Sequence, residues 1–141
     1  MEPSIHHLNH VNYWAIFACA FLQWMLGAAW YSPALFSKIW MKELGITPDP
    51  SKRNSMIFGM VSSLVGDIFL SFVLWHMVMW ANAGSFAFGT FVGFLCWFGF
   101  FVAPNFAQGI YEGRSFKVFA INNGYWLIGL LASGGILAVW R

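Results

Sequence analysis

Four long runs of apolar residues constrain this chain more than any other feature. They cover residues 13–31, 56–80, 86–106 and 118–140, and each is long enough for a helix to cross roughly 30 Å of hydrocarbon. The runs do not alternate polar and apolar residues as the strands of a membrane barrel would, so they predict helices. Composition agrees, because 60% of the residues are hydrophobic and only 9% are charged, too few to coat a water-soluble globule.

We therefore expect an all-α polytopic membrane protein in which residues 1–141 form a single transmembrane domain, a four-helix bundle. The first run lacks the basic segment of a signal peptide and is longer than its apolar part, so we expect it to be retained. Cys19 and Cys96 both lie in apolar runs, where free thiols behave as small hydrophobes, and they predict no disulfide.

The basic residues predict the orientation. Six of the seven Lys and Arg residues follow the first and third runs, and only Arg141 lies on the other side. Because cytoplasmic loops carry an excess of Lys and Arg, we expect a multi-pass protein of the cell inner membrane with cytoplasmic basic loops and both termini outside. The charge is not clustered as nucleic-acid binding requires, so no nucleic-acid partner is expected.

Residues 34–44 predict a short helix that lies in the inner interface. Pro33 breaks the first helix, and Leu35, Phe36, Ile39, Trp40 and Leu44 then recur at helical spacing, with lysines on the opposite face. This helix could be a spacer in the membrane plane, or it could bind lipid or a partner.

Asp67 is the one carboxylate inside an apolar run. Counted from Met56 at 1.5 Å per residue, it lies roughly 16 Å deep, near the bilayer mid-plane. An ionised, unpaired carboxylate is costly there, so Asp67 should be protonated, paired or in contact with a wet cavity. Residues at similar depth, and hydroxyls one turn away on the same stripe, complete a predicted mid-membrane polar layer of Asp67, Gln23, Tyr125, Ser63 and Ser71.

Two interpretations of this layer stay open. In the structural one, a neutral Asp67 donates a hydrogen bond to Gln23 or to a carbonyl and fixes the register of the helices. In the functional one, Asp67 binds a proton, a cation or a substrate amine during transport.

A second group of polar residues gathers at the inner end of the predicted bundle. Glu112 and Arg114 would have to pair if they were buried. The group is either a loop held by an ion pair and asparagine caps, or a mouth that binds a small polar ligand or a lipid headgroup. This predicted cytoplasmic polar cluster comprises Tyr31, Ser32, Asn105, Gln108, Glu112, Arg114, Asn122 and Asn123.

The four histidines fall on the outer side. His6 and His10 are spaced i, i+4 with His7 between them, and His76 is followed by Met77, so His6, His10 and His76 are weak candidates for metal or haem ligation. A solvated lead-in and an interfacial histidine explain the same residues more simply. We expect no metal and no cofactor.

No catalytic constellation occurs, and we expect a protein that is not an enzyme. An enzyme acting on lipid would need an interfacial nucleophile or base, for which only Glu112, Tyr111 or the histidines could serve.

Small residues recur four apart in the third and fourth runs, a spacing that lets helix backbones approach closely. The pairs are Gly89 and Gly93, Ala120 and Gly124, Gly129 and Ser133, and Gly134 and Ala138. These stripes could all be used inside one bundle, or they could mediate association. We predict an interaction or assembly protein of the lipid bilayer, either a homo-oligomer or a subunit of a larger membrane complex. The alternative is a small transporter or channel-like protein that uses Asp67.

Two stretches, "WYSPALFSKIW" and "YEGRSFKVFAINNGYWLIGLLASGGILAVW", resemble the signature ends of the bacterial family called domain of unknown function 1761. The resemblance implies a small integral membrane protein with four spans, and it implies no reaction. The matching residues are Trp30, Tyr31, Ser32, Pro33, Phe36, Trp40, Glu112, Gly113, Arg114, Asn122, Gly124 and Tyr125.

Overall fold

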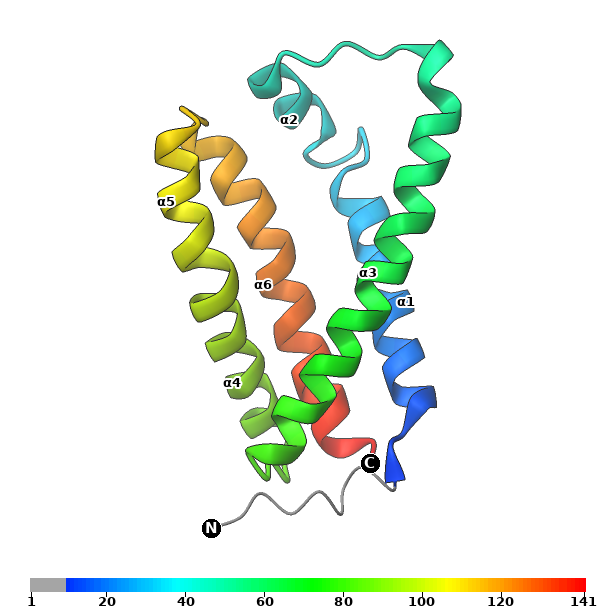
Figure 1. The fold of residues 1–141 in the computed structure, drawn as a ribbon, viewed down its shortest axis with the longest axis vertical. Coiled ribbons are helices and arrows are strands. Elements are labelled where there is room, and N and C mark those ends of the chain that lie inside the picture. The colour runs from blue at the N-terminus through cyan, green and yellow to red at the C-terminus, as the bar shows by residue number, and fades with distance from the viewer. Residues whose placement is uncertain (1–9) are drawn as a thin grey trace.

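The computed structural model of the protein describes residues 10–141, and every regular element in that part of the chain is a helix (Figure 1). The all-α prediction is therefore confirmed for these residues. The elements are α1 (Tyr13–Trp30), α2 (Ser37–Leu44), the 3-10 turn η2 (Pro50–Lys52), α3 (Arg53–Trp80), α4 (Phe86–Trp97), the π-helical segment η3 (Phe98–Val102), α5 (Ala103–Tyr111) and α6 (Phe116–Val139). The segments α4, η3 and α5 follow one another without a break and form one rod.

Three helical segments of the described chain are long and apolar enough to cross a membrane, namely Tyr13–Trp30, Pro50–Trp80 and Phe86–Tyr111. The fourth predicted run corresponds to α6, which has 24 residues but is less apolar. Its polar side chains Asn123 and Tyr125 are buried against the other helices. Because α6 is largely covered by protein, it does not need the apolar surface that lipid requires.

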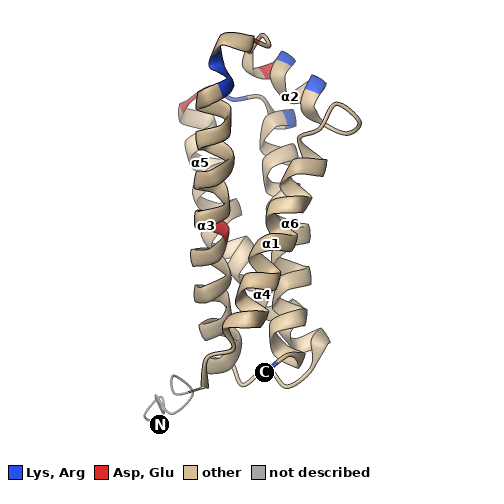
Figure 2. Ribbon diagram, turned by 90° about the vertical axis from the view of Figure 1, so that its right-hand side faces the viewer, with Lys and Arg blue, Asp and Glu red and all other residues tan. Residues whose placement is uncertain are grey.

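The long helices run side by side, and α2 lies at one end of them (Figure 1). We call this the basic end, because Lys and Arg gather on α2 and in the segments that lead into α3 and α6 (Figure 2). The opposite, terminal end holds the start of α1, the turn between α3 and α4, and the C-terminus. There the Asn12 side chain donates to the Trp140 carbonyl at 3.3 Å, and the Arg141 guanidinium donates to the Ala83 carbonyl.

The closest helix pair is α4 with α6, and glycines make the approach possible. A Cβ atom at Gly89 would overlap the Gly134 carbonyl, and one at Gly93 would overlap the Leu130 carbonyl. A Cβ atom at Gly129 would in turn overlap the Gln23 side chain of α1. These predicted small-residue stripes are thus used within one chain.

Packing is uneven along the bundle. Between Arg53 and Gly66, α3 has no buried residue, whereas its second half buries Asp67, Ser71 and the core residues Leu74 and Val78. The core is therefore concentrated toward the terminal end. It consists mainly of Ala15, Ile16, Cys19, Leu74, Trp75, Val78, Ala83, Val92, Cys96, Leu130, Leu137 and Ala138.

The helix predicted over residues 34–44 begins later than expected, at Ser37. A tight turn comes first, because the amides of Leu35 and Ser37 both donate to the Ser32 carbonyl, at 3.0 and 3.2 Å. The helix ends at Gly45, which has a left-handed φ of 65°. Its location in a membrane interface stays a prediction.

Candidate functional site

A cavity of about 880 Å³ lies toward the basic end between α1, α2, α3 and α6, and we call it the lateral cavity. It lies where the first half of α3 leaves the bundle, so packing does not fill the space. Its walls are mostly aromatic rings, methionines and small residues. They consist of Trp24, Gly27, Ala28, Tyr31, Ser37, Trp40, Met41, Met56, Gly59, Met60, Ser63, Gly66, Asp67, Leu70, Tyr125 and Trp126.

Asp67 lies midway along α3 and lines this cavity. Its side chain is buried, with 3% of its surface exposed, and its Oδ2 atom has no hydrogen-bond partner among the described residues. The Gln23 amide is buried in the same way, with neither polar atom paired. Leaving a buried polar atom unpaired costs about 1–3 kcal/mol, so such atoms in a native protein call for a ligand, a water or a role.

Two of the aromatic side chains in the cavity wall donate hydrogen bonds to the backbone. Trp24 Nε1 donates to the Met60 carbonyl at 2.9 Å, and Tyr125 Oη donates to the Gln23 carbonyl at 3.3 Å. Both partners are backbone carbonyls, so neither bond depends on a side-chain rotamer. The rings are thereby fixed in place.

At the basic end of the cavity, one amide oxygen anchors two aromatic side chains. Tyr31 Oη and Trp40 Nε1 donate to Asn122 Oδ1 at 2.7 and 3.1 Å. The Tyr31 ring packs edge-on against both Trp40 and Tyr125, with centroids 5.5 and 5.7 Å apart. This cluster joins α1, α2 and α6, and it includes four residues of the two signature stretches.

The predicted polar layer is only partly brought together. Gln23, Asp67, Ser71 and Tyr125 are buried, but no hydrogen bond joins Asp67 to Gln23 in the described part of the chain. The expectation for Ser63 was wrong: it is exposed and donates to the Met60 carbonyl of its own helix at 2.8 Å. Ser63 precedes the point at which α3 joins the bundle, so sharing a stripe with Ser71 does not bury it.

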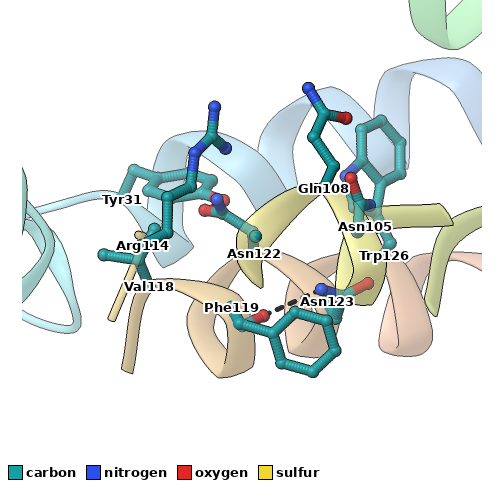
Figure 3. Close-up of a pocket in the computed structure, with 10 residues that line it drawn as sticks. Tyr31, Asn105, Gln108, Arg114, Val118, Phe119, Asn122, Asn123 and Trp126 are labelled. Carbon is teal, nitrogen blue, oxygen red and sulfur yellow. Dashed lines mark hydrogen bonds between the residues drawn. The ribbon is translucent and has the colours of Figure 1, made fainter. Parts of the chain in front are cut away.

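A second cavity, of about 290 Å³, lies at the basic end between α5 and α6 (Figure 3). We call it the polar cavity. Six of the eight residues of the predicted cytoplasmic polar cluster line it. The lining is Tyr31, Asn105, Gln108, Gly109, Arg114, Val118, Phe119, Asn122, Asn123 and Trp126.

The other two members of that cluster lie beside the polar cavity. Glu112 accepts from Gln108 at 2.7 Å and pairs with Arg114. Both charged side chains are exposed, so the pair forms without the burial on which the sequence argument depended. Ser32 does not line the cavity and donates to the Ala29 carbonyl at 2.7 Å. Inside the cavity, Asn123 Nδ2 donates to the Phe119 carbonyl at 2.9 Å, while its Oδ1 is buried without a partner among residues 10–141 (Figure 3).

Tyr31 and Trp126 line both cavities, so these two side chains separate the lateral cavity from the polar cavity. A path from Asp67 to the basic end would pass between them.

A surface contact ties α2 to α6 outside these cavities. The Lys117 ammonium lies 3.2 Å from Glu43 Oε1. Hydrogen bonds from Ser115 and then from Lys117 lower the pKa of Glu43.

The weak metal candidates do not converge in the described chain. His6 lies outside the described residues, and no three His, Cys, Asp or Glu side chains from residue 10 onward lie close enough together to hold a metal ion. His76, expected at the interface, is instead buried, because it packs against the rings of Phe72, Trp75 and Trp80. Its Nδ1 lies 2.8 Å from the Phe72 carbonyl.

Sequence reasoning missed the aromatic and methionine walls. Trp24 and Trp126 directly follow Gln23 and Tyr125, two residues that were predicted to lie deep in the membrane. Tryptophans that face lipid concentrate at the membrane interfaces, so two at depth are a signal of contact with protein or ligand. The residues missed are Trp24, Trp40, Met41, Met56, Met60 and Trp126.

No curated protein and no solved structure matches the chain. A family model does match, and it covers residues 14–138, which include the first signature stretch and nearly all of the second. The chain therefore belongs to the family described as "Protein of unknown function (DUF1761)".

Proposed function

We propose that this protein is a small transporter with four membrane spans, which binds a solute in the lateral cavity and exchanges it for a proton at Asp67. The observation that carries the proposal is the buried Asp67 carboxyl, whose Oδ2 has no hydrogen-bond partner among residues 10–141, on the wall of a cavity of about 880 Å³. A carboxyl group inside a membrane bundle is costly, and such groups mark ion and substrate pathways. A purely structural Asp67 would instead be expected to bind a neighbouring side chain or carbonyl.

The proposal takes α6 as the fourth span. Its 24 residues exceed the roughly 20 needed, and it runs beside the α4–α5 rod and contacts α1 and α3 (Figure 1). The basic end is then cytoplasmic, with α2 in the interface, and the start of α1 and the C-terminus face the outside of the cell inner membrane.

The polar cavity supplies the cytoplasmic end of the path. It lies at the basic end, it is lined by amides, and it meets the lateral cavity at Tyr31 and Trp126. Because Tyr31 and Trp126 line both cavities, rotation of these two side chains would connect the lateral cavity with the polar cavity.

Assembly, as a homo-oligomer or as a subunit of a larger complex, is the second candidate. The glycines that suggested it are covered by helices of the same chain. Its support is now the exposed phenylalanine side chains of the α4–α5 rod, among them Phe88, Phe91, Phe98 and Phe100. Lipid contact accounts for the same surface.

The proposal is tested by infrared difference spectroscopy of the protein in lipid between pH 5 and pH 9. We expect a carboxylic acid band that converts to carboxylate within this range, that is lost in Asp67→Asn, and that is kept in Ser71→Ala. The other titratable side chains that line the lateral cavity are Tyr31 and Tyr125, and an ordinary phenol titrates near pH 10. A band that stays unchanged across the range would mean that Asp67 is closed off from water, and transport would be ruled out.

A further inference from the structure

We infer that the solute of the lateral cavity is a hydrophobic organic cation, such as a substituted ammonium or phosphonium ion with aromatic or branched alkyl groups. The inference rests on the proposed function, since it names the chemical class bound at that site.

The charged residues that line the cavity favour a cation over an anion. Asp67 is the only ionisable acid or base with a charge near neutral pH among the described residues that line it, and no Lys, Arg or His is present there. An anion would meet a carboxylate with no positive group to balance it. A cation would instead pair with that carboxylate, and a buried charge is tolerated when it is paired.

The cavity walls have little remaining capacity to donate hydrogen bonds to a ligand. The polar hydrogens of Trp24, Tyr31, Trp40 and Tyr125 are all donated to protein acceptors. The Ser63 hydroxyl is donated to the Met60 carbonyl. The walls thus offer few free donors to a sugar or another neutral polar solute, and they leave ring faces and thioethers as the main contact surface.

The aromatic rings around the cavity also favour a cation. Trp24, Tyr31, Trp40, Tyr125 and Trp126 come from three elements and the turn that follows α1, and they surround one space. A cation within about 6 Å of a tryptophan or tyrosine ring gains about 0.5–2 kcal/mol per ring. Met41, Met56 and Met60 complete the lining with flexible apolar side chains that adapt to ligand shape. The volume of about 880 Å³ accommodates a drug-sized molecule.

The test compares tetraphenylphosphonium with tetraphenylborate, two ions of the same shape and opposite charge. Binding to the full-length protein in nanodiscs is followed by equilibrium dialysis and by tryptophan fluorescence, with empty nanodiscs subtracted. We expect saturable binding of one phosphonium per chain and no saturable binding of the borate. Asp67→Asn should weaken phosphonium binding by about tenfold or more, which corresponds to about 1.4 kcal/mol.

Two further variants separate loss of the site from loss of the fold. Gly66 lines the cavity with open space around it, so Gly66→Leu should occupy part of the cavity beside Asp67 without disturbing the core and should weaken binding. Trp24→Leu should weaken binding about threefold to tenfold by removing one ring. The matched control is Trp14→Leu on the same helix, because Trp14 is 80% exposed and lies outside the cavity.

Saturable binding of the borate, or phosphonium binding that is unchanged in Asp67→Asn and in Gly66→Leu, would overturn the inference. If the phosphonium does not bind while the Asp67 carboxyl band still converts with pH, the ligand class is wrong and the proposed function survives. If the phosphonium does not bind and the Asp67 carboxyl band does not convert with pH, the ligand class and the proposed function are both wrong.

Discussion

The half of the bundle near the terminal end (the terminal half) is closely packed, whereas the half near the basic end (the basic half) contains a cavity, although the same helices form both. In the terminal half, α4 and α6 touch backbone to backbone, because Gly89, Gly93 and Gly134 have no side chains to hold them apart. In the basic half, α6 instead carries Tyr125 and Trp126, and α3 leaves the bundle. Small residues thus set where the helices meet, and large rings keep a cavity open beside them.

Asp67 lies at the boundary between the halves. It is the first buried residue of α3, and the residues before it are exposed or partly exposed. Packing in the terminal half holds α3 in place, while in the basic half the lateral cavity lies beside the carboxyl group. Moving a carboxylate one turn in either direction would place it in the packed core or on the exposed surface.

The largest effect should come from breaking the tight half. Gly93→Ala puts a Cβ against the Leu130 carbonyl, where backbone has to move, so we expect it to destabilise the protein by about 3 kcal/mol. The matched control is Gly99→Ala in η3 of the same rod, which has open space around it and should be nearly neutral. Thermal unfolding in detergent measures both. Equal effects would show that α4 and α6 are not in close contact.

The contact between α1 and α6 should show a coupled effect. Gly129→Ala would overlap the Gln23 side chain, so we expect a loss of about 2 kcal/mol. In the background of Gln23→Ala that loss should largely disappear, with a coupling of about 1–2 kcal/mol in a double-mutant cycle. Additive effects would contradict the packing of Gly129 on Gln23.

Removing the buried carboxyl should stabilise the protein while abolishing its proposed function. Asp67→Leu replaces an unpaired buried group with an apolar one, so we expect a gain of about 1–2 kcal/mol in the free energy of unfolding. Ser71→Ala, which removes a buried, unpaired hydroxyl one turn away, should give a smaller gain. Destabilisation by Asp67→Leu would mean that Asp67 has a partner in the native state, which favours the structural interpretation.

The smallest effect should be at the surface, where Glu43 ties α2 to α6. Because the pKa of Glu43 is lowered in the folded protein, its contribution is present above the pKa of the unfolded state and is lost as the pH falls through the folded value. We expect the protection factors of amide exchange in α2, which correct for the pH dependence of the intrinsic exchange rate, to fall slightly on acidification below that value. Glu43→Gln should remove this pH dependence without changing the core. Exchange that is equally pH-dependent in Glu43→Gln would assign the effect to another group.

Much of the fold could be predicted because the position of each apolar helix depends on the residues within that helix. The first and third predicted runs start at Tyr13 and Phe86, where α1 and α4 begin, since apolar runs end at polar turns. The pairing of Glu112 with Arg114 was only partly predictable. The two residues are two positions apart, but their side chains are exposed, so the cost of burying a lone charge does not explain the pair.

The site was less predictable because it depends on which face of each helix meets a neighbour. Ser63 and Ser71 are equivalent in the sequence, yet only Ser71 is buried, because α3 joins the bundle between them. The rings of Trp24, Trp40 and Trp126 converge across three helices, and no spacing within one helix indicates that.

By itself the sequence determined that the chain is a bundle of apolar helices with an isolated carboxylate in one of them, because length, hydropathy and small-residue spacing act within single helices. The tertiary structure alone decided that this carboxylate faces an aromatic cavity rather than a hydrogen-bond partner. Side-chain environment depends on how neighbouring helices diverge, and that divergence results from the balance of small and large residues across different helices.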